Sequence, residues 1–202
     1  RIPPKKTLEI AQELYTAGYI SYPRTSSQQY PESIGFKKIL TSLSKNQSYA
    51  KLAKKLLDKK GLAPNNGKKT DPAHPAIYPT GIFPSLSDKY KEKVYDIIVR
   101  RFLATFGDHA LRETNKIEID VNKEGFLTKG TRTVEKGWHI FYGPYVKIEE
   151  EDIPNVSKDD IIDINKIKKH DKETQPPKRY TPSSIIRELE KRNLGTKATR
   201  AQ

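Results

Sequence analysis

The sequence predicts an α+β protein of several domains: a mainly helical domain over residues 1–107, a small antiparallel β unit over 108–172, and the start of another helical domain over 173–202. Three observations favour this division. Apolar residues recur at helical spacing in the first part, and they alternate with polar residues early in the second. A proline-containing linker then precedes a last helical pattern. A chain of 202 residues has room for one or two domains of the usual size.

The first expected helix follows Pro3-Pro4, with Thr7 as a candidate cap. It ends at Gly18, because glycine adopts the left-handed conformation of a helix C-terminus without strain. The next residues, 18–27, read as a short strand that leads into a polar turn.

Three more helices are expected before the β unit. Apolar spacing predicts short helices within residues 34–43 and 52–57, and a long helix from a cap at Ser87 to a stop at Gly107. Between them, residues 61–86 are rich in Pro, Gly and Asn. A loop of this length in a compact domain is often functional.

The β unit begins with clean alternation over residues 117–121, followed by a hairpin turn at 122–125. The apolar and aromatic signal then moves to residues 138–146, and isoleucines at 161–167 predict a further strand. The last helix is expected to start at Thr181-Pro182, since threonine is a good N-cap and proline fits the first helical position.

Composition restricts the classes of function. The chain has no cysteine, which excludes disulfides and thiolate metal sites and fits a reducing cytoplasm. No apolar run is long enough for a membrane span. The net charge of +13 divides into +11 over residues 1–107, −5 over 108–165 and +7 over 166–202. Two basic segments therefore flank an acidic one, which indicates a polyanionic partner such as nucleic acid, although lysine-rich helices are often only solvated.

One short segment carries candidate chemistry. Tyrosine is a competent nucleophile toward phosphorus if its proton is removed and the phosphate is neutralised. Arg24 follows Tyr22 by two residues, and a guanidinium can hold phosphate oxygens in a bidentate manner. A continuing strand would place both side chains on one face. Taken alone, these residues are better explained as a structural turn, and the four histidines show no metal-binding spacing.

Three motifs follow one another along the chain. The first is the tyrosine segment with the helix before it, residues 7–26. The second is His74-Pro75-Ala76-Ile77-Tyr78-Pro79-Thr80, and the third covers residues 176–199, with Leu194-Gly195-Thr196-Lys197-Ala198-Thr199 at its end. Together they cover nearly the whole chain and resemble, in family order, the motifs of the type IA DNA topoisomerases. The Tyr-Pro-Arg and His-Pro-Ala-Ile forms are most similar to archaeal topoisomerase I and topoisomerase III.

The resemblance implies a role for each matching residue. Tyr22 corresponds to the nucleophile that forms a 5′-phosphotyrosine bond with one DNA strand, and Arg24 to the arginine that positions the scissile phosphate. His74 corresponds to a histidine near the phosphate backbone; alone, it would be read as a turn residue. Thr199, with Lys197 as a weaker candidate, falls in the strand-binding segment. Transesterification would keep the phosphodiester bond energy in the phosphotyrosine, so resealing is expected to need no ATP.

The sequence departs from the family at two places. Ser26-Ser27 replaces the common Asp-Ser, and residues 196–200 differ from the usual bacterial Arg-Pro-Ser-Thr-Tyr, so the phosphate contacts there stay open. The family's N-terminal Toprim domain, which binds Mg²⁺ and carries a general-acid glutamate, has no counterpart in the chain. We therefore expect a piece of a longer enzyme that relaxes negative supercoils in the cytoplasm but is inactive alone.

By the same resemblance, residues 1–107 match the domain that opens as a gate, 108–172 part of the hinge, and 173–202 the start of the strand-binding domain. Single-stranded DNA is the expected partner. The alternative is a non-catalytic module that stacks nucleic-acid bases on its aromatic residues. A tyrosine recombinase or type IB topoisomerase is disfavoured, since those place the tyrosine late in the chain. The parent could be an archaeal topoisomerase I, a topoisomerase III or a reverse gyrase.

Overall fold

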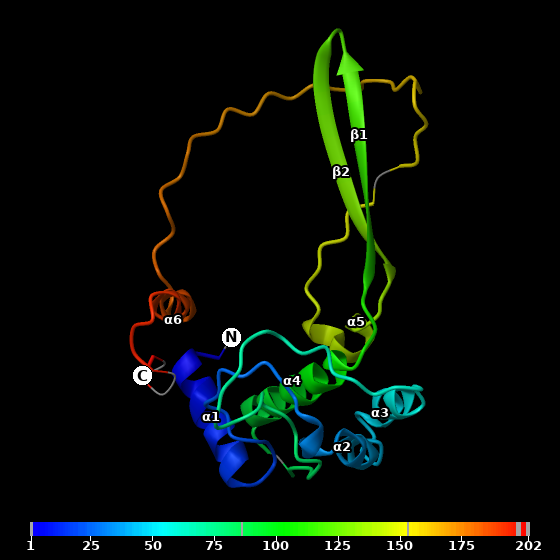
Figure 1. The fold of residues 1–202 in the computed structure, drawn as a ribbon. Coiled ribbons are helices and arrows are strands. Elements are labelled where there is room, and N and C mark those ends of the chain that lie inside the picture. The colour runs from blue at the N-terminus through cyan, green and yellow to red at the C-terminus, as the bar shows by residue number, and fades with distance from the viewer. Residues whose placement is uncertain (1, 86, 153, 197–198, 201–202) are drawn as a thin grey trace.

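The computed structural model describes residues 2–85, 87–152, 154–196 and 199–200, and its α+β class agrees with the prediction. A helical base supports a long hairpin, and an extended arm returns from the hairpin to the last helix (Figure 1). The described elements, in chain order, are the helices α1 (Pro4–Thr16), α2 (Phe36–Leu43), α3 (Ala50–Leu57) and α4 (Lys89–Thr105), the strands β1 (Leu111–Val121) and β2 (Glu124–Glu135), and the helices α5 (His139–Tyr142) and α6 (Pro182–Lys191). Short 3₁₀ turns span Glu32–Ile34 and Gly143–Tyr145.

The core lies around α4. Apolar side chains from α1, α2 and α3 pack against it, and Phe102 and Phe106 are almost fully buried at its C-terminal end. Their rings meet edge to face, with centroids 5.1 Å apart. Lys91 of α4 also pairs with Glu13 of α1 at 2.6 Å. The tyrosine segment is therefore attached to a packed helical unit.

Two of the expected caps were wrong. Asp88, rather than Ser87, caps α4 by accepting from the Tyr90 N–H at 2.7 Å. Helix α1 starts earlier than expected, at Pro4, so Thr7 lies inside it and its hydroxyl donates to the carbonyl of Pro3. The predicted cap of α6 is confirmed, since Thr181 and Ser184 satisfy each other's backbone N–H groups.

The hairpin extends further than the alternation indicated. Strands β1 and β2 are antiparallel, with Ile119 opposite Phe126 and Val121 opposite Glu124. Asn122 and Lys123 form the turn with φ angles of 53° and 68°, the conformation of a two-residue type I′ turn. Residues Asn115, Ile117, Ile119 and Val121 share one half-buried face, as period-2 alternation requires.

Residues 138–145 form helical turns, although the sequence had placed them in the β unit. Phe141 is buried against α4, and the N–H of Trp138 donates to the carbonyl of Asp108 at 2.8 Å. Asp96 of α4 accepts from the hydroxyls of Tyr145 at 2.8 Å and Tyr49 at 3.0 Å. These contacts attach the foot of the hairpin to the helical base.

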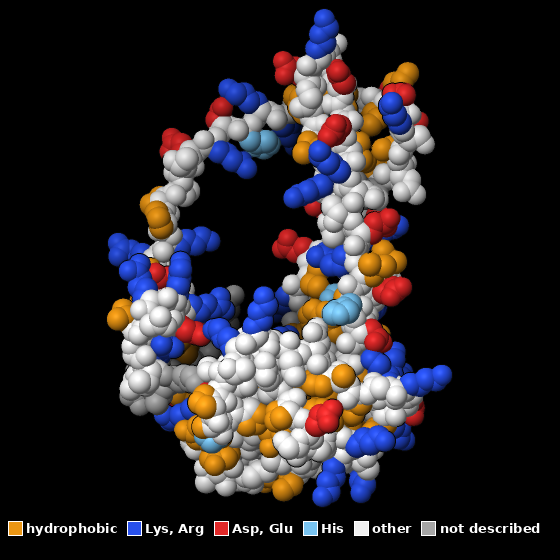
Figure 2. All heavy atoms as spheres, viewed as in Figure 1, with side chains coloured by type: hydrophobic (Ala, Val, Ile, Leu, Met, Phe, Trp, Pro, Cys, Tyr) orange, Lys and Arg blue, Asp and Glu red, His pale blue; other side chains and the backbone are white. Residues whose placement is uncertain are grey.

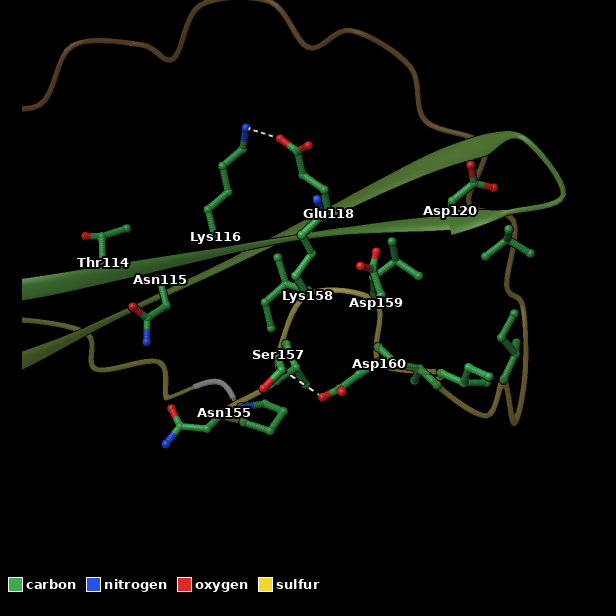
Figure 3. A pocket seen from close by; sticks show the side chains of 18 of the residues that line it. Thr114, Asn115, Lys116, Glu118, Asp120, Asn155, Ser157, Lys158, Asp159 and Asp160 are labelled. Atoms are coloured by element: carbon green, nitrogen blue, oxygen red, sulfur yellow. Dashed lines mark hydrogen bonds and ion pairs between the residues drawn. The ribbon is translucent and has the colours of Figure 1, made fainter.

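The strand predicted at 161–167 was also wrong. The structure assigns no strand to these residues, and Ile161 is 98% exposed. A strand needs a neighbour to pair with, and the β-branched side chains alone do not supply one. A groove of about 980 Å³ separates residues 154–164 from the half-buried face of β1 (Figure 3).

The extended arm ends in α6, which contacts the helical base. Lys69, in the loop before α4, forms an ion pair with Glu190 of α6 at 2.7 Å. Both side chains are about half exposed, so this pair contributes little stability. None of the described helices is long and apolar enough to cross a lipid bilayer.

Candidate active site

The tyrosine segment leaves α1 through a left-handed turn. Gly18 has a φ of +78°, and the N–H of Tyr19 donates back to the carbonyl of Leu14 at 2.9 Å. This 6→1 bond is the mark of a Schellman C-cap, which favours glycine because a side chain at positive φ is strained. The turn directs residues 19–27 across the loop that precedes α4.

These residues run antiparallel to residues 71–80 but do not form the predicted strand. Only Ile20 and Pro79 make a ladder bridge. Around it, the N–H of Ser21 donates to the carbonyl of Tyr78 at 2.9 Å, and the N–H of Thr80 to the carbonyl of Tyr19 at 3.0 Å. The fixed φ and missing N–H of Pro23 interrupt a regular ladder, so side-chain bonds complete the pairing.

Tyr22 is held by two aromatic neighbours. Its ring centroid lies 4.4 Å from that of His74 and 5.3 Å from that of Tyr15, the latter at an edge-on angle of 76°. The ring is half-buried, while its hydroxyl has no hydrogen bond to any residue that the structure describes. The structure therefore brings Tyr22 and His74 together across 52 residues of sequence and leaves the Tyr22 hydroxyl without a hydrogen bond to the described residues.

Arg24 shares this segment. Its side chain is half-buried, and within the described ranges the guanidinium has neither an ion pair nor a hydrogen bond. Because all five guanidinium N–H donors are left for an incoming ligand, the group is suited to hold an anion such as a phosphate. The next residue, Thr25, donates its hydroxyl to the carbonyl of His74 at 3.1 Å.

Comparison with known proteins agrees with the motifs. The chain matches the DNA topoisomerase family over residues 1–202. It belongs to the type IA DNA topoisomerases. DNA topoisomerase 1 of Methanothermobacter thermautotrophicus is 49% identical over 98% of the chain, and that of Pyrococcus horikoshii is 50% identical over 98%. Human DNA topoisomerase 3-alpha is 33% identical over the whole chain.

The chain spans only part of these topoisomerases. It covers 27% of the Methanothermobacter protein, 29% of the Pyrococcus protein and 20% of the human one. The relatives include both archaeal topoisomerases I and topoisomerases 3-alpha, the two groups to which the motifs are most similar.

Thr199, which the sequence predicts to bind the DNA strand, has no hydrogen bond to the cluster formed by Tyr15, Tyr22, Arg24 and His74 (the tyrosine cluster) among the described residues. Thr199 exchanges its hydrogen bonds with Thr196, the shortest being 2.9 Å from the Thr196 N–H to the Thr199 hydroxyl. Arg200 donates to the carbonyls of Leu194 and Gly195. Lys197 lies outside the described residues.

Two residues in or beside the tyrosine cluster were missed from the sequence. Tyr15 was read only as an apolar helix position, yet it contacts the Tyr22 ring and is 40% exposed. Asp71 begins the turn that leads to His74, and its carboxylate also bonds to Ser26. The Asp-Pro pair at 71–72, a frequent turn former, was the available signal.

The described residues hold no group of three or more His, Asp or Glu side chains placed to bind a metal ion. Within this part of the chain, the acidic side chains are therefore not arranged to hold Mg²⁺. Basic side chains gather where α6 approaches the helical base and over α3 (Figure 2). They belong to Lys178, Arg179, Arg187, Lys191 and Arg192 around α6, and to Lys51, Lys54, Lys55, Lys59 and Lys60 on and after α3.

Proposed function

We propose that this chain is the part of a type IA DNA topoisomerase that carries the nucleophile. The whole enzyme cleaves one DNA strand through a 5′-phosphotyrosine intermediate, passes a strand and reseals the break, which relaxes negative supercoils. The observation that carries this proposal is the Tyr22 ring, held between Tyr15 and His74 with its hydroxyl unbonded within the described residues.

The reaction is a transesterification. The Tyr22 oxygen attacks the scissile phosphorus and gives up its proton as the new P–O bond forms, while the bond from phosphorus to the 3′ oxygen breaks. The departing oxygen takes a proton and becomes a free 3′ hydroxyl. The phosphodiester energy is kept in the phosphotyrosine, so resealing by that hydroxyl needs no ATP.

Arg24 and His74 have supporting roles in this proposal. Charge develops on the phosphate oxygens in the transition state, and a preorganised cation stabilises it. The Arg24 guanidinium, without an ion pair in the described ranges, supplies that cation. His74 would contact the same phosphate, which its ring contact with Tyr22 supports. Lys197 and Thr199 would hold the strand further along.

We propose a different role for each of the three parts of the chain. Residues 1–107 would form the gate, 108–172 the hinge and 173–202 the start of the strand-binding domain. The basic first and last parts would bind single-stranded DNA through its phosphates, with an affinity that falls steeply with salt. A Toprim domain in the same polypeptide would supply Mg²⁺ and the general acid. The enzyme would then work in the cytoplasm on chromosomal DNA.

The test is a pair of hydroxyl deletions in the full-length polypeptide. Tyr22→Phe keeps both ring contacts, since the hydroxyl has no bond in the described part of the chain, but removes the nucleophile. We expect it to bind a single-stranded oligonucleotide normally and to form no covalent adduct. Tyr90→Phe, an exposed hydroxyl on α4, is the matched control and should form the adduct at the wild-type rate. Adduct formation by Tyr22→Phe would contradict the proposal.

A second candidate function is non-catalytic binding of single-stranded nucleic acid. The exposed Tyr15 ring beside Tyr22 favours it, because bases stack on such rings with about 1–3 kcal/mol each. This alternative predicts that wild-type protein forms no adduct and that Tyr15→Ala weakens binding. The same measurements of adduct formation and oligonucleotide binding therefore separate the two functions.

A further inference from the structure

The carboxylate of Asp71 joins the segment that carries Tyr22 to the turn that carries His74. Asp71 Oδ2 accepts from the N–H of Ser26 at 3.2 Å and from the Ser26 hydroxyl at 3.3 Å. Its other oxygen, Oδ1, accepts from the N–H of Ala73 at 3.1 Å and, more weakly, from that of His74 at 3.4 Å. Asp71 is thus bonded both to the segment that carries Tyr22 and to the turn that carries His74.

These bonds fix the backbone on both sides of the His74 ring. The backbone N–H of His74 points to Asp71, and the backbone carbonyl of His74 accepts from the Thr25 hydroxyl at 3.1 Å. Backbone pairing holds the segments near Ser21 and Tyr78, and again where the N–H of Ala76 donates to the carbonyl of Gln29 at 3.0 Å. Between these two places, from Arg24 to Ser27, the connections come from the side chains of Thr25 and Asp71. These two side chains therefore help to set the position of the His74 ring against Tyr22.

We propose that Asp71 is a positioning residue for DNA cleavage: its carboxylate sets the register of the Tyr22 segment against the His74 turn without contacting the DNA. This inference rests on the proposed function. A displacement of the nucleophile by about 1 Å can lower the rate of the chemical step on the order of 10²-fold, so loss of this positioning should slow DNA cleavage. It should leave the affinity for the DNA strand unchanged, because the Asp71 bonds described above are made within the protein.

The geometry distinguishes three substitutions. Asp71→Ala removes the bonds to Ser26, Ala73 and His74 described above. Asp71→Asn keeps one oxygen for the Ala73 and His74 N–H groups but presents an NH₂ group to the Ser26 N–H, so it separates the two segments while leaving the turn. In the double variant Ser26→Asp with Asp71→Ser, the carboxylate comes from the opposite segment, and the hydroxyl of residue 71 can donate to it.

The experiment measures single-turnover cleavage and oligonucleotide affinity in the full-length polypeptide. We expect Asp71→Ala to cleave about 10- to 100-fold more slowly at saturating DNA with an unchanged Kd. Asp71→Asn should lie between it and the wild type, and the double variant should recover rate relative to Asp71→Ala. Asp58→Ala, which removes an exposed carboxylate at the end of α3, is the control and should behave as wild type.

Two results would overturn the inference. One is an unchanged cleavage rate in Asp71→Ala. The other is a parallel loss of affinity and rate in Asp71→Ala with no recovery in the double variant, which would assign Asp71 a purely structural role. Both leave the proposed function intact, since that function fails only if wild type forms no adduct or Tyr22→Phe forms one.

Discussion

At the scale of single residues, the site combines a tyrosine whose ring is fixed with an arginine whose charge is not neutralised inside the described part of the chain. Sequence reasoning could single out Tyr22 and Arg24 as candidate chemistry, because they lie two residues apart, but the family resemblance was needed to assign them roles. It could name His74 only through the family resemblance. The contact between the His74 and Tyr22 rings depends on a turn and hydrogen bonds from a distant loop, which no local pattern encodes.

The role of Arg24 predicts a graded loss of rate. Arg24→Ala should slow single-turnover cleavage by about 10²-fold, the usual effect of removing one preorganised donor to developing charge. Arg24→Lys should recover only part of this loss, because an ammonium cannot make the bidentate contact. Arg101→Lys, where the guanidinium lies over the Tyr142 ring, is the control and should cleave normally. Equal rates for Arg24→Lys and wild type would show that charge alone suffices.

Tyr145 predicts how stability depends on pH. Burial, and then its hydrogen bond to the Asp96 carboxylate, raises the pKa of Tyr145 to about 12 from its ordinary value of 10. The unfolded chain therefore loses this proton first, so the stabilisation is complete below pH 10 and is lost as the pH rises from about 10 to about 12. Burial raises the pKa of Tyr30, Tyr49 and Tyr95 as well, with the same sign.

Urea unfolding of the 202-residue chain between pH 8 and pH 12 measures this loss. The Tyr145→Phe variant should lose less stability across that window than the wild type, and Tyr90→Phe should follow the wild-type curve. At pH 8, Tyr145→Phe should cost about 1 kcal/mol for the lost hydrogen bond to Asp96. Parallel curves for Tyr145→Phe and wild type would contradict the assignment.

At the scale of elements, helices and the hairpin, which depend on nearby residues, could be predicted from the sequence. Strands that would have to pair with a distant segment could not. The α4 and α6 helices and the hairpin follow from periodicity and turn chemistry within each segment. Residues 18–27 and 161–167 have strand-like composition, but among the described residues the first segment makes only the single Ile20–Pro79 bridge and the second makes none, because pairing depends on what lies beside them. Residues 138–145 became helical where their aromatic side chains pack on α4.

The join between hairpin and helical base predicts a contrast between two glycines. At Gly137 the φ is +45°, and an added Cβ would overlap the backbone carbonyls of Asp108 and His109. Gly137→Ala should therefore cost about 1–3 kcal/mol or more, since the backbone must shift. Gly125→Ala, at the far end of the hairpin with open space around it, should change stability by less than about 1 kcal/mol.

Trp138 is the single tryptophan of the chain and follows Gly137 directly, so its fluorescence reports on this join. We expect Gly137→Ala to lower the urea midpoint followed by Trp138 emission, and Gly125→Ala to leave it in place. An unchanged midpoint in Gly137→Ala would mean that the hairpin is not held at this position.

At the scale of the whole molecule, the net charge of +13 is best understood through its distribution. The basic residues belong to the helical base and to the region of α6, while the hairpin and the residues after it carry the acidic excess. In Figure 1 the extended arm after the hairpin returns to the helical base, so that α6 comes close to it. The ion pair between Lys69 in the loop before α4 and Glu190 of α6 lies at this approach. Charge counts could predict two basic parts, but only the arrangement in space places α6 next to the helical base, near the foot of the hairpin.

The account predicts that the chain does not act alone. The chain spans less than a third of the Methanothermobacter, Pyrococcus and human topoisomerases, and the proposed function assigns Mg²⁺ and the general acid to a Toprim domain of the full-length polypeptide. We expect the purified 202-residue chain to bind single-stranded DNA but not to cleave it, with or without Mg²⁺. Detectable strand cleavage by the chain alone would contradict this expectation.

The most direct test of the central claim is to identify the amino acid that becomes attached to DNA. The full-length polypeptide would be trapped on a single-stranded oligonucleotide, digested with protease and analysed by mass spectrometry. The account predicts one peptide–nucleotide conjugate, linked from the Tyr22 oxygen to a 5′ phosphate and absent in Tyr22→Phe. A conjugate at another residue, or a 3′ phosphate linkage, would contradict it.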